Sequence, residues 1–174
     1  RLSHEKGADV LLEALARIGD PSVVASVLGS GPEAPRLRAL AERLGIGGRV
    51  IWHGLVPEAG RCFAAFDIFV MSSRAEGTPI VAFEAMAAEV PIVATAVGGL
   101  PDVLAGGVAE LVPNEDIEAL AGRVRAVMGD REAAAHRARA ARRRLESVYG
   151  IDAWLAGYDT IYRGLHAARP QSSL

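Results

Sequence analysis

Cysteine is almost absent from this sequence, since Cys62 is the only one in 174 residues. A single cysteine excludes an internal disulfide framework and any metal site built from several cysteines. Long apolar runs are missing too: none approaches the roughly 18 residues that a membrane-spanning helix needs, and the first residues lack the layout of a signal peptide. We therefore expect a soluble, cytoplasmic protein with no indicated membrane association.

The net charge is small, and lysine is nearly absent. A net charge of −2 offers no general attraction to nucleic acid, so no nucleic-acid partner is expected. Lys6 is the only lysine among the 19 basic residues. On composition alone two interpretations stay open: the preference for arginine reflects the composition of the genome, or Lys6 has a task of its own.

Short apolar runs alternate with helical patterns along most of the chain. Strands are predicted at residues 23–28, 49–53, 67–71, 91–96 and 108–112. Helices are predicted at residues 7–18, 35–44, 59–65, 79–89, 117–128, 131–149 and 151–165, with a short helical turn near Pro101. This βα repetition predicts an α/β fold, a Rossmann-like doubly wound parallel sheet with helices on both faces.

The length fits a single domain. We expect residues 1–149 to form its Rossmann-like part. Residues 150–174 would add a last helix and, from Pro170 onward, a frayed tail to the same domain.

Ligands of doubly wound sheets bind beyond the carboxyl ends of the strands, so the segments after each strand are candidates for a site. Four of these segments, at residues 29–32, 54–57, 72–78 and 97–99, supply small residues that let a ligand approach backbone amides. For any one of them taken alone, ordinary turn chemistry is the better explanation. Four together favour a binding site.

The helix predicted at residues 79–89 begins beside one of these loops. Thr78 is suited to its N-cap and Pro79 to its first helical position. Free amides and the positive dipole end of a helix attract phosphate or another oxyanion. Glu76 lies just outside that end.

Glu84 is the only charged residue in the middle of this apolar helix. Burying an ionised carboxylate costs several kcal/mol unless donors or a cation compensate, so Glu84 should reach a cleft or a defined partner. Ribose hydroxyls are one such partner. A structural ion pair with an arginine such as Arg74 is the alternative.

Several separated motifs resemble the group 1 (family 4) retaining glycosyltransferases. Glu76 and Glu84 have the spacing of that family's E-x7-E motif, and residues 1–7 resemble its G-R-L-x-x-x-K-G segment. The likeness continues through residues 28–32, 50–54, 90–94 and 98–102 to the closing helices, so it covers nearly the entire chain. Two departures are Glu89, where the family usually has glycine, and Asp102, where it usually has glutamate.

This resemblance implies the C-terminal, donor-binding half of a GT-B enzyme, with the acceptor held mainly by an N-terminal domain that this chain lacks. Its first strand would be absent or incomplete. Arg1 and Lys6 would bind the donor diphosphate, assisted by the backbone of Gly77, Thr78 and Pro79. Glu84 would bind the ribose, and Glu76 would be the catalytic residue that contacts the donor sugar. Residues that line the base and the cleft would be Gly29, Ser30, Gly31, His53, Gly54, Leu55, Val56, Gly98 and Gly99.

The donor substrate implied is a UDP-, GDP- or ADP-linked sugar. No cofactor and no metal is expected, because Arg1 and Lys6 can stabilise the charge that grows on the leaving diphosphate. A glycosidase also uses two carboxylates, but it needs no phosphate-binding cations. A nucleotide-sugar epimerase of similar fold and a non-catalytic nucleotide-binding module remain alternatives.

Two features near the end of the chain are expected to lie outside the site. The arginines of the penultimate helix form a solvated face: Arg137, Arg139, Arg142, Arg143 and Arg144. The last helix resembles the one that returns to the N-terminal domain in this family. Its apolar face should therefore lack its usual cover: Trp154, Leu155, Tyr158 and Ile161.

Overall fold

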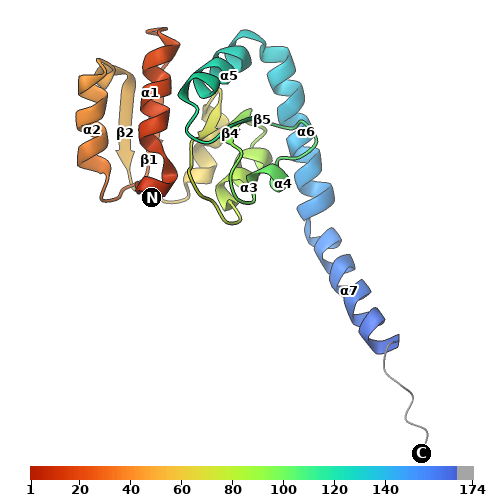
Figure 1. The fold of residues 1–174 in the computed structure, drawn as a ribbon. Coiled ribbons are helices and arrows are strands. Elements are labelled where there is room, and N and C mark those ends of the chain that lie inside the picture. Colours follow the sequence, from red (N-terminus) through yellow and green to blue (C-terminus); the bar gives the residue numbers. More distant parts are fainter. Residues whose placement is uncertain (168–174) are drawn as a thin grey trace, which may run out of the picture.

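The computed structural model describes residues 1–167 and places their strands in two parallel sheets (Figure 1). The strands are β1 (Ala25–Leu28), β2 (Val50–Gly54), β3 (Phe69–Met71), β4 (Ile92–Thr95) and β5 (Glu110–Val112). β1 pairs with β2, and the second sheet has the order β3-β4-β5, with every one of these pairings parallel. Each strand lies within its expected range, except that β2 extends to Gly54.

The helices confirm the expected alternation with the strands. They are η1 (His4–Lys6), α1 (Ala8–Ile18), α2 (Ala34–Arg43), η2 (Gly47–Arg49), η3 (Ala59–Ala65), α3 (Ile80–Ala87), α4 (Leu100–Val103), α5 (Ile117–Gly129), α6 (Arg131–Tyr149) and α7 (Ile151–Ala167). The segment η3 is a 3-10 helix rather than an α-helix, a form common in short helical pieces.

One expectation about the start of α3 is wrong. Pro79 is the N-cap residue, not Thr78, and no side chain caps the helix. The reason is the backbone of Pro79, which is extended with ψ 91, so helical geometry begins only at Ile80.

The residues of β4 alternate between two apolar cores. Ile92 and Ala94 pack with residues of α3, α4 and α6, whereas Val93 packs with residues of α1 and α5. Successive side chains of a strand point to opposite faces of its sheet. Helices therefore cover both faces of the second sheet, as the βα pattern predicts.

The helix α1 connects the two sheets. Its Leu12 packs in one core with Val27 of β1, and its Val10 packs in another with Val93 of β4. Figure 1 accordingly shows α1 between α2 and β2 on one side and α5 and β4 on the other. Because η1 directly precedes α1, this packing also determines where η1 lies.

The first seven residues contact the loops that follow β1 and β3. The amide of Leu2 donates to the Ser30 carbonyl at 2.8 Å, and the amide of Arg74 donates to the Glu5 carbonyl at 2.8 Å. Residues 1–3 form no strand. The opening segment therefore lies at the carboxyl ends of the strands, the edge where the sequence predicts a site.

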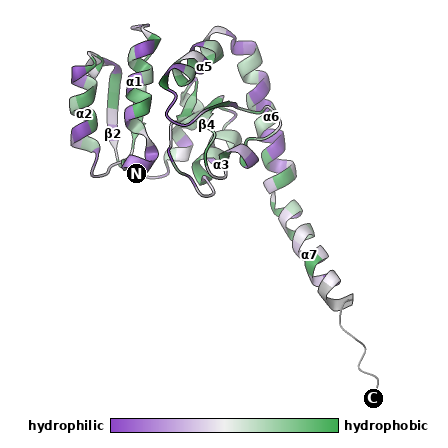
Figure 2. Ribbon diagram, in the orientation of Figure 1, coloured by the Kyte–Doolittle hydropathy of each residue, from purple (hydrophilic) through white to green (hydrophobic). Residues whose placement is uncertain are grey.

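The last helix, α7, projects away from the rest of the molecule, and Figure 2 shows apolar segments along it. Trp154, Leu155, Tyr158 and Ile161 are 45–59% exposed, so the expected uncovered apolar face is present. No helix within residues 1–167 is long and apolar enough to cross a membrane. The tail expected from Pro170 onward lies outside the described residues.

Candidate functional site

An ion pair between Lys6 and Glu76 lies at the centre of the candidate site. The Nζ atom of Lys6 is 2.7 Å from Oε1 of Glu76, although the two residues are 70 positions apart. The Glu76 side chain is only 7% exposed, whereas that of Lys6 is 41% exposed. Lys6 therefore offers an accessible cation beside an almost covered carboxylate.

Ser73, which lies in the expected loop 72–78, and Thr95, which the sequence did not single out, position Glu76. The Ser73 hydroxyl donates to Oε1 of Glu76 at 2.6 Å. The Thr95 hydroxyl, at the end of β4, donates to the Ser73 carbonyl at 2.5 Å, and Thr95 is 1% exposed. No sequence pattern predicts these contacts, because they arise only where β3 and β4 end side by side.

Gly7 allows η1 to approach the loop after β3. Its φ of +58° lies in the left-handed region, and an added Cβ would overlap with the Ser72 carbonyl. The Ser72 hydroxyl in turn donates to the Gly7 carbonyl at 2.8 Å. A larger residue at this position would push Lys6 away from Glu76.

The loop with Gly98 and Gly99 packs against the loop with Glu76 and Gly77. Gly98 has a φ of +54°, and an added Cβ there would overlap with the Glu76 carbonyl. The amide of Gly99 donates to the Gly77 carbonyl at 3.2 Å. Gly98 and Gly99 thus lie against the Glu76–Gly77 segment, and Gly77 and Thr78 are exposed in front of α3.

A second group of expected residues gathers around the chain start. The Gly29 amide donates to the Gly54 carbonyl at 2.6 Å, and a Cβ at Gly29 would lie 3.6 Å from the backbone nitrogen of Arg1. A Cβ at Gly31 would overlap with the backbone of Leu2. Arg1 is exposed. Arg1 therefore lies against the loop after β1, and that loop is hydrogen-bonded to the last residue of β2.

Three further expected residues, one in β2 and two directly after it, differ in their exposure to solvent. Leu55 is 80% exposed, and Val56 is partly buried. His53 belongs to β2 itself, and its Nε2 lies 3.1 Å from the Ser26 hydroxyl on the neighbouring strand. His53 thus contacts β1 rather than Lys6 or Glu76.

Glu84 is exposed, so its carboxylate does not bear the cost of burial that the apolar helix suggested. The helix α3 buries Ala82, Ala85 and Met86, and Glu84 lies on a different side, where a Cβ at Gly60 of η3 would be 3.2 Å from its Cδ. Within residues 1–167 Glu84 forms no ion pair. The periodicity of a wholly apolar helix could not reveal which side faces solvent.

Arg74 pairs with Asp9 and Glu115, not with Glu84. Its Nη1 donates to Oδ1 of Asp9 at 2.9 Å, and its Nε donates to Oε1 of Glu115 at 2.7 Å. Burial opposes ionisation of Asp9, but hydrogen bonds from Arg74 and then Arg36 outweigh it and lower the pKa of Asp9 to about 2. The hydrogen bond to Asp9 likewise raises the pKa of Arg74.

The arginines of α6 do not simply form a solvated face, which corrects another expectation. Arg142 donates to the Ala87 carbonyl at 2.5 Å, and Arg144 donates to the Asp102 carbonyl at 2.8 Å. These carbonyls lie at the carboxyl ends of α3 and α4, where helices leave acceptors without intrahelical partners. The arginines thereby attach α6 to both helices, while Arg139 stays exposed.

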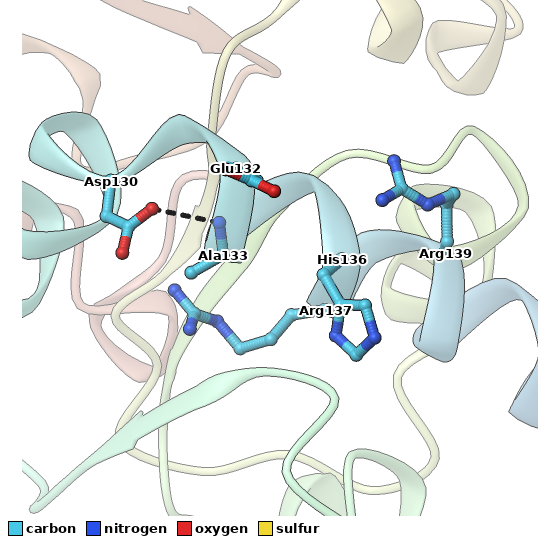
Figure 3. A pocket seen from close by; sticks show the side chains of 6 residues that line it. All are labelled: Asp130, Glu132, Ala133, His136, Arg137 and Arg139. Atoms are coloured by element: carbon cyan, nitrogen blue, oxygen red, sulfur yellow. Dashed lines mark hydrogen bonds between the residues drawn. The ribbon is translucent and has the colours of Figure 1, made fainter.

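An open hollow lies at the start of α6 (Figure 3), and neither Lys6 nor Glu76 lines it. It is lined by Asp130, Glu132, Ala133, His136, Arg137 and Arg139. Oδ1 of Asp130 accepts from the Ala133 amide at 2.9 Å and so caps the helix. The hollow mixes carboxylates with cations, and it contains none of the site residues expected from the sequence.

The sequence of this chain resembles those of known glycosyltransferases over most of its length. The family model of the group 1 glycosyl transferases matches residues 1–144. A D-inositol 3-phosphate glycosyltransferase of Mycolicibacterium smegmatis is 34% identical over 180 residues, which cover 98% of this chain and 41% of the relative.

Solved structures share this fold. Sucrose-phosphate synthase from Thermosynechococcus elongatus is 30% identical, with a TM-score of 0.83 over 97% of this chain and 44% of the synthase. HepE from Anabaena in complex with UDP is 26% identical, with a TM-score of 0.84 over 96% of this chain and 47% of HepE. A second HepE structure, with UDP-glucose, has a TM-score of 0.83. This chain spans less than half the length of these relatives, and it belongs to the group 1 glycosyl transferases.

Proposed function

We propose that this chain is the donor-binding domain of a retaining glycosyltransferase and binds a nucleoside diphosphate sugar at the carboxyl ends of its strands. The observation that carries the proposal is the position of Lys6, the only lysine, which Glu76 holds at 2.7 Å beside the glycine-rich loops. HepE, which resembles the chain in fold and sequence, was solved with UDP and with UDP-glucose. UDP is therefore our first candidate, with GDP and ADP as the alternatives.

The charges at this edge suit a diphosphate. An ammonium group has three N–H donors, and Glu76 engages one donor of Lys6, which leaves two for phosphate oxygens. Arg1 adds a second exposed cation beside Gly29. Exposed Gly77 and Thr78 precede the uncapped N-terminus of α3, where backbone amides favour an anion.

Transfer would proceed by loss of the nucleoside diphosphate from the donor sugar. Negative charge accumulates on the diphosphate as the glycosidic bond breaks, so its attraction to Lys6 and Arg1 grows toward the transition state. Glu76 would orient the donor sugar, and Glu84 would accept hydrogen bonds from the ribose. Acceptor binding and proton transfer would belong mainly to an N-terminal domain. We propose that stabilising the charge on the diphosphate requires no metal ion. We also propose that the enzyme is cytoplasmic.

Calorimetric titration of the chain with UDP, GDP and ADP tests the binding site. At least one nucleotide should bind, and Lys6→Ala or Glu84→Ala should weaken it about 10- to 100-fold, the value of one or two hydrogen bonds to charged groups. Arg139→Ala removes an exposed cation of α6 and is the matched control, with unchanged affinity. EDTA should leave the affinity unchanged. Binding of none of the three nucleotides would refute the proposal.

The reaction requires a protein that joins this chain to an acceptor-binding domain. We expect such a protein to transfer the sugar with the anomeric configuration of the donor retained, as assigned by NMR of the product. An inverted product would contradict a retaining mechanism. Conversion of the donor into an epimeric nucleotide sugar without any acceptor would instead support the epimerase alternative.

A further inference from the structure

Arg74 lies behind the Lys6–Glu76 pair and joins the segments on either side of it. Its Nη1 donates to the His4 carbonyl in η1 and to Oδ1 of Asp9 in α1, both at 2.9 Å. Its Nη2 donates to Oδ2 of Asp9 at 3.2 Å, and its Nε donates to Glu115 at 2.7 Å. The Arg74 side chain is only 16% exposed.

These contacts occupy most of the guanidinium group. A guanidinium has five N–H donors, and four of those of Arg74 are engaged with His4, Asp9 and Glu115. Two carboxylates balance its charge. Arg74 is therefore bound to the protein itself and is poorly placed to take a ligand.

The turn that carries Lys6 depends on outside support. η1 has three residues, and 3-10 turns of this length have weak hydrogen-bond geometry. Arg74 supports it twice: its guanidinium binds the His4 carbonyl, and its amide donates to the Glu5 carbonyl at 2.8 Å. These two carbonyls directly precede Lys6 in the sequence.

Arg74 also stands two residues before Glu76, which binds the Lys6 ammonium. One residue thus connects the backbone that carries Lys6 to the loop that carries its partner. We propose that Arg74 is a positioning residue, which holds Lys6 in place to bind the diphosphate of the donor. This inference rests on the proposed function.

Lys6 itself offers a direct readout, because a protein with a single lysine gives a single lysine side-chain signal when labelled with [15N]lysine. We expect Arg74→Gln to lower the order parameter of the Lys6 side chain. Arg163→Gln removes an exposed ion pair with Asp159 on α7 and serves as the matched control, without effect. An unchanged order parameter of the Lys6 side chain in a folded Arg74→Gln variant would overturn the inference, independently of any ligand.

A double-mutant cycle on UDP binding supplies the second test. Arg74→Gln should weaken UDP about 10-fold when Lys6 is present, and less than about 2-fold in a Lys6→Ala background. Uridine, which has no diphosphate, should bind the unmodified chain and the Arg74→Gln variant with equal affinity. An equal loss in both backgrounds, or an equal loss for uridine, would overturn the positioning role alone. Failure of the unmodified chain to bind any nucleoside diphosphate would refute the proposed function as well.

Discussion

The carboxyl group of Asp9 illustrates at the scale of one residue how neighbouring arginines change ionisation. Its pKa is lowered from 3.8 to about 2 in the folded chain, where hydrogen bonds from Arg74 and Arg36 overcome the effect of burial. A group whose pKa falls on folding stabilises the folded state above its unfolded pKa. That stability is lost as the pH falls through the folded pKa.

We expect Asp9→Asn to reduce the free energy of unfolding by about 1 kcal/mol at pH 7, since solvent screening reduces the larger value that the pKa difference alone implies. The difference should shrink as the pH falls from the unfolded pKa of 3.8 toward about 2. Urea unfolding of the parent chain and of the Asp9→Asn variant at several pH values measures this difference in the free energy of unfolding. A difference that does not depend on pH would show that the carboxylate charge is not what stabilises the fold.

Single residues also mark a limit of sequence reasoning. Lys6 and Glu76 were both expected to lie in the site, and they do lie together, but their ion pair was not predicted. Glu84 was chosen because burial of its charge needed an explanation, and it is exposed. A motif identifies residues by their spacing along the chain, whereas exposure depends on what packs around them.

At the scale of elements, close contact between loops depends on glycines that precede the helices. A Cβ at Gly98 would meet the Glu76 carbonyl, and the φ of +54° disfavours any larger residue. In contrast, Gly122 lies within α5 and has open space around its Cβ position. The two glycines therefore form a matched pair for substitution by alanine.

Gly98→Ala should lower the free energy of unfolding by at least about 2 kcal/mol, through left-handed backbone strain and overlap with the carbonyl. Gly122→Ala should raise it by about 0.5–1 kcal/mol, because alanine favours a helix interior. Denaturant unfolding of both variants measures these opposite effects. Equal changes in the free energy of unfolding of the two variants would mean that Gly98 does not lie against the Glu76 carbonyl.

For the molecule as a whole, the apolar face of α7 contributes little to the folded domain. Trp154 and Tyr158 are 54% and 45% exposed, whereas Leu120 of α5 is fully buried. The rings of Trp154 and Tyr158 contact each other, with centroids 4.4 Å apart. Their exposure brings apolar surface into contact with water, which favours association with other surfaces.

We expect the double substitution of Trp154→Ser and Tyr158→Ser to change the free energy of unfolding by less than about 0.5 kcal/mol. Leu120→Ala, the buried comparison, should cost about 2–5 kcal/mol. Sedimentation at increasing concentration should detect less self-association of the double variant than of the parent chain. A loss of stability near that of Leu120→Ala would mean that α7 packs on the domain.

The sequence by itself determined the order of the strands and of the main helices, and the loops at the carboxyl ends of the strands. Periodicity, strand-forming runs and glycine-rich turns are local properties, so βα repetition and the carboxyl-edge loops were predicted within a few residues. Several separated motifs, among them the one with Glu76 and Glu84, likewise identified the family, because such motifs depend only on spacing along the chain.

The tertiary structure alone decided which distant groups meet. Arg74 and Asp9 are 65 residues apart, and Arg142 binds a carbonyl 55 residues away. Such contacts depend on how α1 and α6 pack against the second sheet. Local patterns predict that these helices exist, but the partner of each charged side chain follows only from the positions that packing imposes on the whole chain.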